Sequence, residues 1–130
     1  MNKYVADTMA VVLRLEKRKM PDASKQLFEQ AEHGKVEIFI PAMVFSEIGY
    51  LSEKNKIDTG LEEVKQYLGK HSHIKELPLT FEIVKTAFSI NDIPELHDRL
   101  IAASAKELDI EIITNDPDIE ESRYVKTIWK

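Results

Sequence analysis

The chain contains no cysteine among its 130 residues, which excludes disulfide bonds and thiolate metal ligands. Glycine is scarce, with four residues, and no glycine-rich phosphate loop is present, which disfavours nucleotide-binding folds of the dinucleotide and P-loop kinds. No apolar run approaches the length of a membrane span, and the sequence begins directly with a strand-like segment rather than a signal peptide. We therefore expect a cytoplasmic protein with no membrane partner.

Excess positive charge is also missing, because the formal net charge is −5. A general DNA-coating role needs a basic surface and is therefore disfavoured. An acidic protein can still process nucleic acid if bound metal cations reverse the sign of its site. Hydrophobic residues make up 43% of the sequence and charged residues 32%, which is typical of a folded domain. The length predicts a single domain over residues 1–130.

The segments that are present alternate between strand and helix patterns. We expect strands at 3–6, 36–40, 73–77, 111–114 and 125–129. We expect helices at 8–17, 21–34, from 41 onward, 59–68, from 80 onward and 92–108. The second strand is apolar at nearly every position, as a strand buried on both faces would be. This order predicts an α/β protein of three layers, with a mainly parallel sheet of about four to five strands flanked by helices.

The stretch from 92 to 118 contains the most informative acids. Asp92 is a candidate cap for the helix, and Asp98 falls on the same stripe as Ile101 and Ala102. A carboxylate on a core-facing stripe is costly unless something pairs with it. The following strand ends in a turn that contains Asp116 and Asp118. Taken singly, each acid is more often explained by helix capping or by a turn.

Four acids occupy comparable places at strand ends and helix starts, namely Asp7, Glu47, Asp98 and Asp116. In a doubly wound sheet these places converge on one edge, where ligands bind. Two carboxylates about 4 Å apart repel by on the order of 4 kcal/mol at an effective dielectric constant near 20. Raised pKa values, basic side chains or a bound metal would relieve this repulsion. Oxygen ligands alone indicate Mg²⁺ or Mn²⁺, and such ions support phosphoester hydrolysis.

Four short motifs stand in an order that matches a known family. They are YVADT at 4–8, PAMVFSE at 41–47, HDRLIAA at 97–103 and ITND at 113–116. Together these motifs span nearly the whole chain. In their order and spacing, the chain resembles a PIN domain, the fold of many small metal-dependent ribonucleases. The chain is most similar to the single-domain toxins of the VapBC kind.

The resemblance implies a role for each matching residue. It implies that one or two Mg²⁺ ions, or Mn²⁺ in their place, are held by the catalytic acids Asp7, Glu47, Asp98 and Asp116, with Asp118 as an optional further ligand. One of these carboxylates would also help to deprotonate the attacking water. The hydroxyl groups of Thr8 and Thr114 would orient the ligands from behind. Met9 departs from the family pattern, which usually has a small polar residue there.

By the same resemblance, the protein would be a toxin that cuts structured RNA, with tRNA the commonest class of target. A small antitoxin would cover the acidic site, and the toxin would form a homodimer. A different hypothesis is a catalytically weak PIN-fold binding module that acts through protein partners. A receiver-like domain that is phosphorylated on an aspartate ranks lower, because Glu47 and Asp98 lie inside helices rather than at strand ends.

Three further features have two interpretations each. His97 is either a catalytic base or, as we favour, an exposed residue at a helix start. Arg99 could contact phosphate or pair with Glu95. The basic run of Arg14, Lys17, Arg18 and Lys19 could track RNA or a partner, or it could be a solvated helix end.

Overall fold

The computed structural model describes residues 1–130 and contains one sheet of five parallel strands. The strands are β1 (Lys3–Ala6), β2 (Glu37–Pro41), β3 (Ile74–Leu77), β4 (Glu111–Ile113) and β5 (Thr127–Ile128). Their order across the sheet is β3-β2-β1-β4-β5, and every neighbouring pair is parallel. The predicted central parallel sheet is confirmed.

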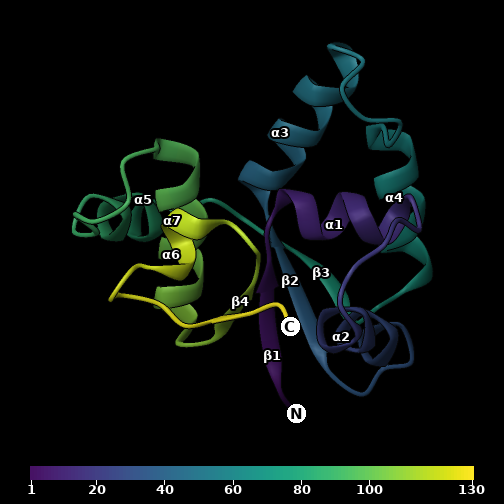
Figure 1. Ribbon diagram of the computed structural model, residues 1–130, viewed down its shortest axis with the longest axis horizontal. Helices are drawn as coiled ribbons and strands as arrows, with labels where there is room; N and C mark the ends of the chain where they lie inside the picture. The colour runs from purple at the N-terminus through teal and green to yellow at the C-terminus, as the bar shows by residue number, and fades with distance from the viewer.

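Seven helices connect the strands, because parallel strands need long crossovers. They are α1 (Thr8–Leu15), α2 (Asp22–Glu32), α3 (Ala42–Glu53), α4 (Leu61–Lys70), α5 (Phe81–Ala87), α6 (Leu96–Leu108) and α7 (Pro117–Glu120). Figure 1 shows α1 to α4 on one side of the strands and α5 to α7 on the other. The three-layer arrangement predicted from the alternation of elements is therefore confirmed.

The direction of strand addition reverses at β1, which pairs with β2 on one side and β4 on the other. Such a reversal leaves a crevice at the carboxyl ends of the two central strands, because their connecting helices go to opposite faces. Val5 and Ile112 pair across these strands and are fully buried, like Ile38 and Ile40 of β2. The apolar core thus lies under the crevice and holds the ends of β1 and β4 in register.

The start of α6 differs from the expectation. The helix begins at Leu96 rather than near residue 92, and its cap is Glu95, whose carboxylate accepts a hydrogen bond from the Asp98 backbone N–H. Asp92 does not cap the helix and contacts the C-terminal segment instead. Ile93 is fully buried, so the chain packs onto the core before the helix can begin.

Smaller differences occur at two other ends. Helix α1 stops at Leu15, two residues early, because Lys17 adopts a left-handed backbone with φ 53°. Strand β5 has two residues, fewer than the 125–129 range predicted from its apolar pattern. None of the helices combines the length and apolar character that crossing a bilayer requires.

Candidate metal centre

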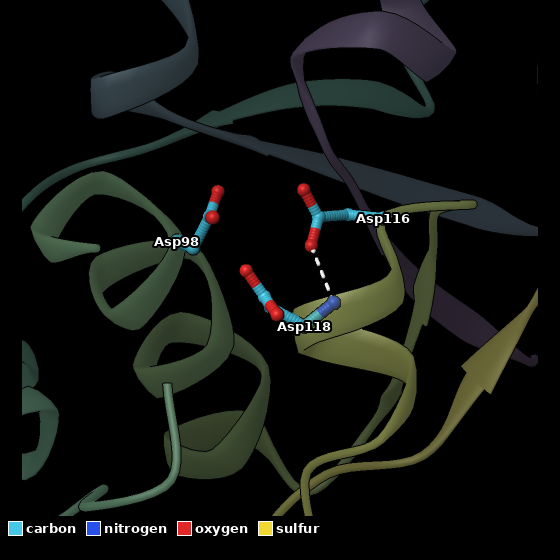
Figure 2. Close-up of side chains that lie close together, drawn as sticks. All are labelled: Asp98, Asp116 and Asp118. Atoms are coloured by element: carbon cyan, nitrogen blue, oxygen red, sulfur yellow. Dashed lines mark hydrogen bonds between the residues drawn. The ribbon is translucent and has the colours of Figure 1, made fainter. Parts of the chain in front are cut away.

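Three carboxylates from two helices meet above the carboxyl ends of the strands. Asp98 lies in the first turn of α6, while Asp116 caps α7 and Asp118 lies in the first turn of α7. Figure 2 shows these side chains facing a common space between the two helices. One oxygen from each residue lies within 4.8 Å of the others, which is close enough for a single cation to contact all three. Asp118, which the resemblance implied only as an optional ligand, is therefore one of these three carboxylates.

The local sequence explains how Asp116 is fixed. Its Oδ1 accepts hydrogen bonds from the backbone N–H groups of Asp118 at 2.9 Å and Ile119 at 3.2 Å. Pro117 suits the first helical position because its missing N–H would have no partner there. The backbone N–H of Asp116 also donates to Thr114 Oγ1 at 3.0 Å. The turn that ends β4 therefore sets both the backbone and the side chain of this acid.

Asp7 follows β1 and caps α1, where its Oδ1 accepts from the Ala10 N–H at 2.9 Å. Because Ala6 pairs with Ile113, the next residues of the two strands, Asp7 and Thr114, come together. The Thr114 hydroxyl donates to the other oxygen of Asp7, and only 6% of Asp7 is exposed. Thr114 consequently links the acid after β1 to the acid after β4.

Glu47 reaches the site from α3, the first helix after β2. The hydroxyl of Thr8 donates to its Oε1 at 2.9 Å, and this bond joins α1 to α3. Glu47 and Asp7 lie outside the group of three, but their charges act on it, since both raise the pKa of Asp98. Thr8 thus contacts Glu47, while Thr114 contacts both Asp7 and Asp116.

None of Asp7, Glu47, Asp98, Asp116 and Asp118 forms an ion pair with a lysine or arginine, although the charge of His97 opposes the raised pKa of Glu47. Burial, followed by the charges of Asp116, Glu95, Glu47 and Asp7, raises the pKa of Asp98 to about 7. Burial likewise raises the pKa of Asp7 to about 6, although bonds from Thr114 and Ala10 oppose the shift. Burial also raises the pKa of Glu47. All ion pairs in the structure involve other acids.

A hard divalent cation fits this arrangement. The ligands offered are carboxylate oxygens only, which Mg²⁺ and Mn²⁺ accept. Burial first, and then the charges of neighbouring acids, raise the pKa values of Asp7, Glu47 and Asp98, and a bound cation would favour their charged forms. The residues present are therefore compatible with the predicted metal, and Asp98, Asp116 and Asp118 are the acids whose oxygens lie close enough together to share one ion.

Residues beside the acids behave differently from some expectations. His97 is exposed, as favoured, and its Nδ1 lies 2.8 Å from Glu95 Oε1. Arg99 does not pair with Glu95, because its Nε donates to the carbonyl of Ile93 at 2.5 Å. Sequence reasoning missed Glu95 as a member of the acidic environment, although its position three residues before Asp98 on a helix start was the available signal.

The basic run at the end of α1 is not one solvated surface. Lys17, Arg18 and Lys19 are exposed, as that interpretation requires. Arg14 instead forms a bidentate pair with Glu32 of α2, at 2.9 and 2.6 Å. The solvated reading is therefore wrong for Arg14, because α2 folds back to place an acid against it.

Comparisons with known proteins identify the family and the fold of the chain. The family model described as the PIN domain matches residues 4–123. No curated protein sequence matches the chain. Among solved structures, VapBC2 of Rickettsia felis bound to a promoter DNA fragment is similar, with a TM-score of 0.75 and 18% identity over 98% of this chain and 99% of that one. VapC20 of Mycobacterium tuberculosis, a toxin that cleaves the sarcin-ricin loop, is similar with a TM-score of 0.69 and 13% identity over 98% of this chain and 99% of that one. DNA-bound VapBC of Salmonella typhimurium is similar with a TM-score of 0.72 and 16% identity over 98% of each chain.

Proposed function

This chain belongs to the PIN domain family, and we propose that it is a metal-dependent endoribonuclease that acts as the toxin of a toxin–antitoxin pair. Family members are generally nucleases. The observation that carries the proposal is the group formed by Asp98, Asp116 and Asp118, whose oxygens converge and which form no ion pair with a basic side chain. Burial, followed by the charges of neighbouring acids, raises the pKa of Asp98, and a bound cation would favour the charged carboxylates.

Each acid has a distinct part in the proposed reaction. Asp98, Asp116 and Asp118 would bind Mg²⁺ or Mn²⁺, with Asp7 and Glu47 completing the negative site from the other side. A bound ion of this kind makes water a better nucleophile and offsets charge on the phosphodiester. Thr114 holds Asp7 in place and Thr8 holds Glu47, so neither carboxylate needs to reorganise during the reaction. One of the carboxylates takes the proton of the attacking water.

The proposed substrate is structured RNA, with tRNA as the first class to test. The similar fold of a toxin that cleaves the sarcin-ricin loop supports a structured target. The proposed partner is a small antitoxin that covers the acidic site, since several similar structures are toxin–antitoxin complexes. A homodimer is also proposed. Phe81 and Phe88 stand one heptad apart on or beside α5 and are 76% and 65% exposed, which suits a contact with a second copy.

Cleavage of a pooled tRNA and rRNA sample by the purified protein tests the nuclease proposal. We expect discrete fragments with Mg²⁺ or Mn²⁺ and none with chelator. Asp98→Asn should reduce the rate by at least about 100-fold, because it removes a ligand. Asp109→Asn is the matched control, since Asp109 lies at the opposite end of α6 and asparagine tolerates its left-handed backbone.

Two results would contradict the proposal. Equal cleavage by Asp98→Asn and by the chelated sample would identify a contaminating nuclease. Metal binding without cleavage of any RNA would favour the binding module instead.

A further inference from the structure

We propose that Asp92 is a positioning residue that holds the acids of α6 and α7 at the spacing required for metal binding. The inference rests on the proposed metal-dependent function and deepens it. Asp92 itself lies outside the group of three carboxylates and is not proposed as a ligand. It acts through a set of hydrogen bonds, called here the Asp92 latch, between Asn91 and Asp92 on one side and residues 122–124 on the other.

The latch uses both oxygens of the Asp92 carboxylate. Oδ1 accepts from the hydroxyl of Ser122 at 2.8 Å, and Oδ2 accepts from the backbone N–H of Arg123 at 2.9 Å. Tyr124 adds a third bond, because its hydroxyl donates to Asn91 Oδ1 at 3.1 Å. Ser122 is buried, and its Oγ also accepts from the Tyr124 N–H at 3.2 Å. A loop and a terminal segment about 30 residues apart in sequence are thus joined at three points.

The position of the latch connects it to the acids. Asp92 lies in the segment that leads into α6, and Asp98 is in the first turn of that helix. Arg99 stiffens this connection, because its side chain donates to the carbonyl of Ile93 beside Asp92. On the other side, Ser122 lies two residues after the end of α7 and donates its N–H to the carbonyl of Ile119. The latch therefore ties the entry of α6 to the exit of α7, the two helices that face each other in Figure 2.

Something must oppose the repulsion between these helices before a cation binds. Asp98 faces Asp116 and Asp118, and like charges at this distance push their helices apart. Helix α7 has only four residues and cannot be stable without tertiary contacts. The latch supplies such contacts away from the acids, so that the ligands are already gathered when the ion arrives. Preorganisation of this kind lowers the cost of binding without adding a ligand.

The test measures Mn²⁺ affinity by calorimetry in the full chain without RNA. Asp92→Ala should weaken Mn²⁺ binding about tenfold, the lower part of the range for residues that support ligands indirectly. Asp92→Asn keeps one acceptor and should weaken binding less. Glu121→Gln is the matched control, because it removes one negative charge from the same exposed segment without touching the latch, and it should change affinity less than about twofold.

A mutant cycle separates the latch from a general loss of structure. Ser122→Ala should weaken Mn²⁺ binding by itself, but should add little to Asp92→Ala, because both changes break the same bond. RNA cleavage by Asp92→Ala should approach the wild-type kcat at saturating Mn²⁺, while the metal concentration required for half activity rises. If Asp92→Ala does not fold, Asp92→Asn and Ser122→Ala give the same comparison.

The possible results distinguish the latch from the nuclease proposal. Unchanged Mn²⁺ affinity in folded Asp92 and Ser122 variants, with lowered stability alone, would overturn the latch and leave the nuclease intact. Affinity that depends on Asp92 in a protein that cleaves no RNA would support the latch and overturn the nuclease. A wild-type chain that binds no Mn²⁺ would overturn both.

Discussion

Two regions of this molecule bury carboxylates, and the pKa is raised in one region and lowered in the other. At the candidate metal centre, Asp7 receives hydrogen bonds from Thr114 and Ala10, yet burial still raises its pKa to about 6. Between α1, α2 and α4, burial also acts on Glu32, but bonds from Arg14 and Tyr67 outweigh it and lower the pKa. The decisive difference is a bidentate cation, which neutral donors do not replace.

In the second region, Glu32 and Glu16 each accept several hydrogen bonds from side-chain or backbone donors. The Tyr67 hydroxyl donates to Glu32 Oε2 at 2.5 Å, beside the two bonds from Arg14. Nearby, Glu16 Oε2 accepts from the backbone of Asp58 and from the backbone and hydroxyl of Thr59. These bonds join α1 to α2 and to the segment before α4. Burial of an acid therefore does not by itself indicate a site in this protein, whereas burial without a counter-charge does.

The largest effect expected on stability comes from Arg14→Ala. The change leaves Glu32 partly buried without its cation, which should lower the free energy of unfolding by about 3 kcal/mol. Urea denaturation at pH 7 measures the loss, and Mn²⁺ affinity of the folded protein should stay within about twofold of wild type. The double variant Arg14→Ala with Glu32→Gln should recover part of the loss, because the uncompensated charge is gone. A change in metal affinity with unchanged stability would contradict the division into two regions.

A smaller effect of opposite sign is expected from Asp7→Asn in the metal-free protein. Because the folded state raises the pKa of Asp7, its favourable contribution exists below the unfolded pKa near 4 and is lost as the pH rises through about 6. The asparagine variant should therefore be more stable than wild type by about 2 kcal/mol at pH 8 and nearly equal at pH 4. The amide oxygen of the variant can still accept from the Ala10 N–H, and its NH₂ group can donate to the Thr114 hydroxyl, which donates to Asp7 in the wild type.

Urea denaturation in chelator at several pH values between 4 and 8 measures this difference. Asp109→Asn provides the control, because it removes the same charge from an exposed position at the opposite end of α6 from Asp98. A variant less stable than wild type at pH 8 would mean that Asp7 is stabilised by its surroundings, and the contrast with Glu32 would disappear.

The sequence predicted where the acids of the candidate site lie better than it predicted the packing of the region around Glu32. Asp7, Asp98 and Asp116 could be placed because strand ends and helix first turns are local features, and a parallel sheet brings them to one edge. The pairing of Arg14 with Glu32 depends on how α2 returns across the sheet, which no local pattern contains. Asp92 was wrongly predicted to cap α6 for a similar reason, since Ile90 and Ile93 are buried and the helix begins only after Glu95.

The smallest effect is expected from Asp118→Asn, which tests whether position at the metal centre or exposure decides the importance of an acid. Asp118 belongs to the group of three but is exposed, so water can replace its oxygen on a bound ion. Mn²⁺ affinity, measured by calorimetry, should fall by about threefold to tenfold, well below the loss for half-buried Asp98→Asn. Its backbone N–H would still donate to Asp116, so α7 should keep its cap. Equal losses for the two variants would show that all three carboxylates bind the ion alike, and that burial does not grade the ligands within the site.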